Sequence, residues 1–184
     1  AKLAQVLHHL PFSLTEQQHK AWREISADMQ REQPMHRILQ GDVGSGKTVI
    51  SALALAKAVE NGYQGCIMAP TEILARQHYE TLQQFLQPAG IRIGLLVGGM
   101  RVKARRELLL NLELGLIDVL VGTHALLEED VRFAKLSLAV TDEQHRFGVE
   151  QRARLTNKSA TAPDVLVMTA TPIPRTLALT VYGD

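Results

Sequence analysis

The sequence contains 184 residues, of which 46% are hydrophobic, and this length and composition fit one globular domain with a packed core. The formal net charge is only +1, so the overall charge does not indicate a nucleic-acid partner, and any such contact must be argued locally. The single cysteine, Cys66, excludes an internal disulfide and a cysteine metal cluster. Because no run of 18 apolar residues and no signal-peptide pattern occurs, we expect a cytoplasmic protein without a membrane partner.

The ends of the chain suggest how it is organised. Residues 1–11 precede the first motif, and we expect them to be a linker or the tail of a preceding region. Residues 12–184 are expected to form a single nucleotide-binding domain. The chain starts at Ala1 and stops at Asp184 without a terminal signal, which suggests a piece of a longer protein.

Short apolar segments alternate with longer amphipathic segments along the chain. Six of the apolar segments are candidate strands: Arg37–Gln40, Gly65–Ala69, Ile91–Val97, Asp118–Val121, Leu136–Thr141 and Val165–Thr169. They are continuously apolar, which is typical of strands buried on both faces. The sequence therefore predicts an α/β fold in which a parallel sheet carries helices on both faces.

A glycine-rich loop follows the first candidate strand. Its sequence is Gly41-Asp42-Val43-Gly44-Ser45-Gly46-Lys47-Thr48, which matches the phosphate-binding pattern G-x-x-x-x-G-K-[ST] at every fixed position. The glycines let backbone N–H groups point at phosphate oxygens, and the helix that follows adds the positive end of its dipole. We expect Lys47 to reach the β and γ phosphates of ATP and the Thr48 hydroxyl to hold Mg²⁺.

Two adjacent carboxylates end the fifth candidate strand. We expect Asp142 to hold Mg²⁺ and Glu143 to orient and deprotonate the attacking water. Gln144 and His145 continue this motif, and His145 is either a surface histidine or a relay that senses the nucleotide. A solvated acidic pair at a strand end is the alternative for the carboxylates taken alone.

A motif near the start of the chain has two interpretations. Thr15 and Gln18 have the spacing of a capping box, which would begin a helix that carries Trp22 on its apolar face. Alternatively, Gln18 reads the edge of adenine while Phe12 packs against the base. The two interpretations are compatible, and the residues alone do not favour either.

Threonines at other strand ends are candidate contacts to a nucleic-acid backbone. Thr71 and Thr123, the latter followed by His124, stand between a strand and a helix, where hydroxyl and N–H groups can bind phosphates. Ordinary helix capping is the simpler explanation for each threonine. A basic run over 101–106 could line a DNA path or form a solvated helix face.

The last candidate strand ends in the threonines Thr169 and Thr171, which could couple hydrolysis to movement. Two prolines follow, at positions 172 and 174, and rigidify the exit from the strand.

Taken in order, these motifs resemble those of superfamily 2 helicases and translocases. The segments GDVGSGKT, APTEILA, VGTHALL, DEQH and TATPIPRT are similar to those of the RecG family of bacterial ATP-dependent DNA helicases across nearly the whole chain, with the Mfd translocases as close relatives. Thr141, where an aliphatic residue is usual, and Thr169, where serine is common, depart slightly from the family pattern.

The resemblance implies a RecA-like P-loop NTPase domain that serves as the first motor lobe of a DNA helicase. Such helicases use ATP and Mg²⁺ to process stalled replication forks and Holliday junctions in DNA repair and recombination. Thr71, Thr123 and His124 would contact DNA, and Gln144, Thr169 and Thr171 would couple the nucleotide state to movement. The partners implied are branched DNA, the second RecA-like lobe with its arginine fingers, and a wedge domain, so this lobe alone is expected to be nearly inactive.

Three other interpretations remain open at this point. A P-loop GTPase would need Asn-Lys-x-Asp, and the nearest match, over 157–160, lacks the final aspartate. An RNA helicase of the same superfamily is disfavoured by DEQH in place of DEAD, although only for the largest group. A nucleotide-binding lobe without useful turnover is the non-enzymatic alternative.

Overall fold

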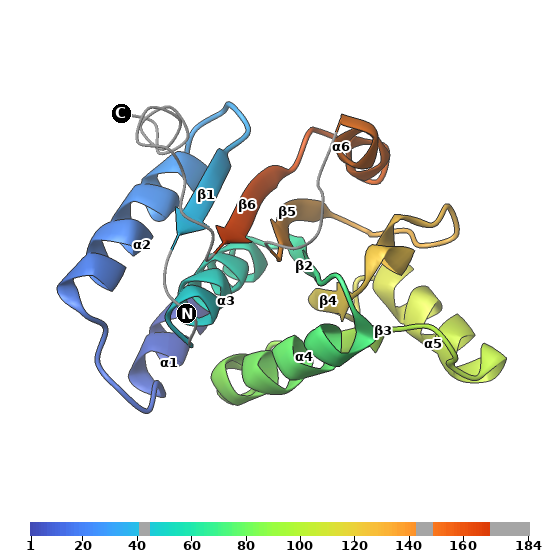
Figure 1. The fold of residues 1–184 in the computed structure, drawn as a ribbon, viewed down its shortest axis with the longest axis horizontal. Coiled ribbons are helices and arrows are strands. Elements are labelled where there is room, and N and C mark those ends of the chain that lie inside the picture. The colour runs from blue at the N-terminus through green and yellow to red at the C-terminus, as the bar shows by residue number, and fades with distance from the viewer. Residues whose placement is uncertain (41–44, 143–148, 170–184) are drawn as a thin grey trace.

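The computed structural model describes residues 1–40, 45–142 and 149–169, which build one six-stranded sheet (Figure 1). All neighbouring strands are parallel, and their order across the sheet is β1-β6-β5-β2-β4-β3. The strands are β1 (His36–Gln40), β2 (Gln64–Met68), β3 (Ile93–Leu96), β4 (Val119–Gly122), β5 (Leu136–Thr141) and β6 (Asp164–Thr169). Each lies within two residues of a predicted strand, because a buried strand is marked by its own apolar run.

Helices cover both faces of the sheet (Figure 1). One face packs against α1 (Lys2–His8), α2 (Glu16–Met29), α3 (Ser45–Glu60) and α4 (Glu72–Leu86). The other packs against α5 (Val102–Glu113), α6 (Val149–Thr156) and the short 3-10 helix η2 (His124–Leu127), while a second 3-10 helix, η1 (Gln87–Ala89), extends α4. This arrangement confirms the predicted α/β fold. No described helix combines the length and apolar character needed to cross a bilayer.

The central strands divide their side chains between two cores. Ile67 of β2 belongs to the core beneath α3, whereas its neighbours Cys66 and Met68 belong to the core beneath α5 and η2. Every residue of β2 and β4 is buried, as continuous apolar runs require. Burial raises the pKa of the Cys66 thiol to about 12, so the thiol is protonated and inert, as expected.

Close backbone packing explains one glycine of the sheet. A Cβ on Gly122, the last residue of β4, would overlap the carbonyl oxygen of Leu96 in β3. Only glycine therefore allows these two strand ends to approach, just before Thr123 begins the η2 turn.

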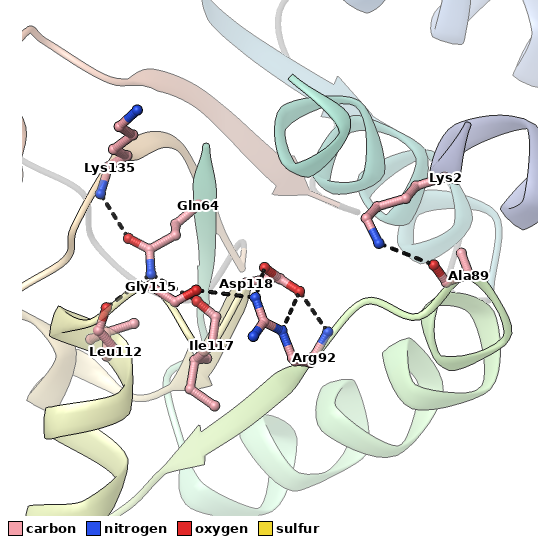
Figure 2. Close-up of polar contacts among 9 residues, drawn as sticks. All are labelled: Lys2, Gln64, Ala89, Arg92, Leu112, Gly115, Ile117, Asp118 and Lys135. Carbon is pink, nitrogen blue, oxygen red and sulfur yellow. Dashed lines mark hydrogen bonds and ion pairs between the residues drawn. The ribbon is translucent and has the colours of Figure 1, made fainter. Parts of the chain in front are cut away.

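The N-terminal helix α1 packs onto the same core as the rest of the lobe. Val6 is fully buried against the α3 side, and Lys2 Nζ donates a hydrogen bond to the carbonyl of Ala89 at 3.4 Å (Figure 2). The sequence predicted only a linker or tail over 1–11, because this segment is too short to show a clear helical pattern of apolar residues. The domain boundary at residue 12 itself stays a prediction.

The amino ends of the strands are joined by polar side chains (Figure 2). The buried amide of Gln64 donates to the carbonyls of Leu112 (3.0 Å) and Ile117 (2.7 Å) and accepts from the N–H of Lys135 (2.8 Å). Arg92 donates to both oxygens of the Asp118 carboxylate, at 3.1 and 3.0 Å. These bonds connect the starts of β2, β3, β4 and β5 with the end of α5.

A half-buried carboxylate joins segments in the same way at the start of β6. Asp164 Oδ1 accepts a hydrogen bond from the backbone N–H of Met35 at 2.6 Å. Burial raises the pKa of this carboxyl to about 6, and the nearby Asp28 raises it further, against the opposing effect of the Met35 N–H.

Candidate functional site

The carboxyl ends of the strands gather the predicted motifs at one edge of the sheet. In the strand pairing, Gln40 lies opposite Thr169, and Met68 lies opposite both Gly122 and Thr141. The segments that follow these strands are therefore brought to a common edge. This edge is where ligands bind in open α/β sheets.

The phosphate-binding loop leads directly from β1 into α3. Gly41, Asp42, Val43 and Gly44 lie outside the described residues, and α3 begins at Ser45. Lys47 and Thr48 are half-buried in its first turn, and the carbonyl of Lys47 accepts a bond from the buried Ser51 hydroxyl at 3.0 Å. A strand and a helix thus flank the motif, as its pattern requires.

The structure bears out the capping interpretation of Gln18, whereas reading of the adenine edge stays a prediction. Its Oε1 accepts from the N–H of Thr15 (2.8 Å) and its own N–H donates to Thr15 Oγ1 (3.2 Å), so the capping box at the start of α2 is confirmed. The amide nitrogen of the same side chain also lies 3.0 Å from the position that a Cβ on Gly46 would occupy. Capping therefore places this amide beside Gly46 in the first turn of α3.

Phe12 precedes α2 and packs against α4. Its ring packs edge-on against Phe85 of α4, with centroids 6.3 Å apart, and remains 38% exposed. An aromatic surface is thus available near the start of α2, while stacking on adenine stays a prediction.

Asp142 directly follows β5, and its backbone N–H donates to the carbonyl of Met68 in β2 at 2.9 Å. Its Oδ2 accepts a hydrogen bond from His78 Nε2 at 2.8 Å, and the two side chains are only 16% and 13% exposed. The other residues of this motif, Glu143, Gln144 and His145, lie outside the described residues.

His78 was missed by the sequence analysis. It belongs to α4 and lies 64 residues before Asp142, on the same helix face as the buried Ala75 and Leu82. The available signal was a histidine within the apolar stripe of an amphipathic helix, which indicates a polar partner but does not identify it.

The two threonines predicted to contact DNA cap helices. Thr71 Oγ1 accepts from the N–H of Leu74 at 3.2 Å at the start of α4, and Thr123 Oγ1 accepts from the N–H of Ala125 at 3.4 Å at the start of η2. Thr71 and His124 are exposed. The capping explanation is therefore confirmed, and a DNA contact remains compatible with it.

The remaining predicted residues are the threonines at the end of β6 and the basic run over 101–106. Thr169 is buried at the end of β6, and Thr171 lies outside the described residues. In the basic run, Arg105 is paired with Asp130 (2.5 Å) and Glu128 (2.9 Å), so this arginine supports the α5 side of the fold.

Metal-binding potential at this edge comes from oxygen ligands. Within the described ranges, no group of three or more histidine, cysteine, aspartate or glutamate residues is arranged to hold a metal ion. Thr48 and Asp142 offer a hydroxyl and a carboxylate, the hard donors that Mg²⁺ prefers when phosphates complete its shell.

Comparison with known proteins identifies relatives over the whole chain. The curated ATP-dependent DNA helicases RecG of Bacillus subtilis (strain 168) and Acidithiobacillus ferridurans are each 54% identical to it, over 183 and 178 residues. These matches cover 100% and 97% of this chain but 27% and 26% of the relatives, so the chain spans about a quarter of their length. The similarity to RecG expected from the motifs is confirmed.

Solved structures agree with this similarity. A structure of RecG bound to a three-way DNA junction superposes with a TM-score of 0.86 and 46% identity, covering 98% of this chain and 24% of that one. Yeast Dbp5 bound to RNA and ADP BeF3 matches with a TM-score of 0.67 at 21% identity, over 98% of this chain and 47% of that one, which shows the shared fold alone. The family model for DEAD/DEAH box helicases matches residues 15–180, and the chain belongs to this family.

Proposed function

We propose that this chain is the ATP-binding motor lobe of an ATP-dependent DNA helicase that acts on branched DNA in repair and recombination. The observation that carries the proposal is the common edge of the parallel sheet, which holds the first turn of α3, with Lys47 and Thr48, and Asp142 at the end of β5. The relatives named RecG and the RecG structure with a three-way junction support DNA forks and Holliday junctions as substrates. A cytoplasmic setting is part of the proposal.

ATP binding and hydrolysis divide among a few residues. Backbone N–H groups of the loop over 41–46 and the Lys47 ammonium bind the phosphates, while Gln18 and Phe12 contact the adenine. Thr48 and Asp142 would hold Mg²⁺, which neutralises charge on the phosphates when bound. Glu143 accepts a proton from the attacking water.

DNA contacts and coupling occupy neighbouring positions at the same edge. Thr71, Thr123 and His124 bind the DNA backbone without reading bases, since a motor that steps along any sequence cannot depend on base edges. Gln144, His145, Thr169 and Thr171 transmit the nucleotide state to these contacts.

Full activity requires parts beyond this lobe. The transition state of phosphoryl transfer gains about 10³ to 10⁵ in rate from an arginine supplied across the cleft in related P-loop enzymes. We assign that arginine to a second RecA-like lobe and junction recognition to a wedge domain. The lobe over 12–184 alone is then nearly inactive as an ATPase.

Lys47→Ala tests the proposal in the full-length protein. A compact ammonium that faces the β and γ phosphates has no substitute in the loop, so we expect ATP affinity to fall at least about 100-fold and unwinding of forked DNA to be lost. Isothermal titration calorimetry and a strand-displacement assay measure the two effects.

The matched control is Lys20→Ala, which removes an exposed lysine from α2. It should retain both properties. Unchanged ATP binding by the Lys47 variant would contradict the assignment of the loop.

A further inference from the structure

His78 and Asp142 form a contact that the proposed function does not use. The hydrogen bond from His78 Nε2 to Asp142 Oδ2 measures 2.8 Å and joins helix α4 to the end of strand β5. Building on the proposed function, we propose that His78 is a positioning residue that fixes the orientation of the Asp142 carboxylate toward the Mg²⁺ of a bound nucleotide.

The backbone of Asp142 is already held in place by its neighbour strand. Its N–H donates to the Met68 carbonyl at 2.9 Å, which continues the β5–β2 pairing by one residue. The side chain still has two rotatable bonds, and the backbone bond does not fix them. A hydrogen bond to one carboxylate oxygen defines the direction in which the group presents its lone pairs.

His78 is held independently of the nucleotide. Helix α4 is capped by Thr71 at its start, and Ala75 and Leu82, one turn to either side of His78, are completely buried. His78 therefore lies on a well-packed helix, which fixes the position of its donor atom, Nε2. Such a donor can preorganise a metal ligand before the metal arrives.

In the contact between His78 and Asp142, the imidazole is the hydrogen-bond donor and the carboxylate is the acceptor. An ionised carboxylate only accepts hydrogen bonds, so Nε2 carries the proton that is shared with Oδ2. Both side chains keep 13% and 16% of their surface exposed, which leaves the pair at the ligand edge and not sealed in the core. Outer partners of metal-binding carboxylates typically change metal affinity by about 10- to 100-fold when removed.

A purely structural role is the competing explanation, in which the bond only fastens α4 to the sheet. Two substitutions separate the roles. His78→Ala removes the donor, whereas His78→Gln keeps an amide N–H at nearly the reach of Nε2. The control is Gln77→Ala, which alters the adjacent, exposed position of the same helix.

The experiment measures binding of a fluorescent, non-hydrolysable ATP analogue to the full-length protein, with Mg²⁺ titrated at fixed nucleotide and a parallel series in EDTA. We expect His78→Ala to need about 10 to 100 times more Mg²⁺ for half-maximal effect, with unchanged binding in EDTA. His78→Gln should restore the wild-type Mg²⁺ requirement to within about threefold, and Gln77→Ala should match the wild type.

Three results would overturn the inference. The first is a wild-type Mg²⁺ requirement in His78→Ala. The second is a loss of nucleotide binding in EDTA as large as the loss in Mg²⁺, and the third is a Mg²⁺ requirement that stays raised in His78→Gln. Each of these results would leave packing as the only role of His78. If the unmodified protein bound no analogue, or bound it without regard to Mg²⁺, the proposed function would fail first, and the inference with it.

Discussion

At the amino ends of the strands, the polar side chains of Gln64, Arg92 and Asp118 bond to segments far along the chain, whereas at the carboxyl ends Thr71 and Thr123 cap the helices that directly follow them. Where β2, β3 and β4 begin, Gln64 donates to the carbonyls of Leu112 and Ile117, and Arg92 donates to the Asp118 carboxylate (Figure 2). Thr71 and Thr123 at the opposite edge bond to N–H groups two or three residues further along the chain. The bonds at the amino edge join distant segments, and the two caps at the carboxyl edge order helix starts that face a ligand.

The difference follows from the direction of parallel strands. In the described part of the chain, β2 and β4 leave the sheet at the carboxyl edge and lead into α4 and η2, whose N-terminal N–H groups point back toward that edge. Anionic ligands are attracted there, while the amino edge receives helix C-terminal carbonyls, which need donors. The Gln64 amide supplies such a donor to Leu112 of α5.

The largest expected effect lies at the carboxyl edge. Glu143→Gln keeps the shape of the side chain but removes the proton acceptor, so the ATPase kcat of the full-length protein should fall about 10²- to 10⁴-fold. ATP affinity and the free energy of unfolding should not change. Steady-state ATPase assays with forked DNA, beside calorimetry, provide the measurement.

Glu150→Gln is the control for this variant, since Glu150 is an exposed acid in the first turn of α6. It should hydrolyse ATP at the parental rate. If the Glu143 variant hydrolysed ATP at the parental rate, Glu143 would not be the proton acceptor.

The amino edge should show the reverse behaviour. Gln64→Leu leaves the carbonyls of Leu112 and Ile117 and the N–H of Lys135 without their side-chain partner. We expect the free energy of unfolding to fall by about 3 kcal/mol, while kcat per folded molecule stays within about twofold. Urea denaturation followed by circular dichroism measures the change.

The same substitution at an exposed glutamine, Gln77→Leu, is the control and should change stability by no more than about 0.5 kcal/mol. A loss of ATPase activity in folded Gln64→Leu protein would contradict the claim that the amino edge contributes to stability and not to catalysis.

The smallest effect concerns Thr71, where capping and DNA contact must be separated. Thr71→Asp keeps an N-cap acceptor of at least equal quality, so stability should be preserved, but it adds a negative charge at the proposed contact with the DNA backbone. We expect affinity for forked DNA to fall about tenfold at fixed salt, measured by fluorescence anisotropy.

Gln77→Glu adds the same charge six residues further along the chain, on α4, and serves as the control. If both acidic variants bound DNA like the wild type, Thr71 would be a helix cap and no more.

The sequence alone determined the strands, two helix caps and the phosphate-binding motif. Strand positions could be predicted within two residues because a strand buried on both faces is marked by its own apolar run. Caps at Thr15 and Thr71 could be predicted because a cap involves residues only three positions apart. The candidate ATP-site residues followed from a local pattern of the same kind.

Only the tertiary structure decided which distant residues meet. The strand order β1-β6-β5-β2-β4-β3, the burial of Val6 in α1 and the contacts of Gln64 arise from packing between segments far apart in the chain. The same holds for His78 and Asp142, which are 64 residues apart and meet because α4 follows β2 and β5 pairs with β2. An apolar pattern predicts that a residue is buried, but it does not predict which residue it will contact, because the hydrophobic effect is not directional.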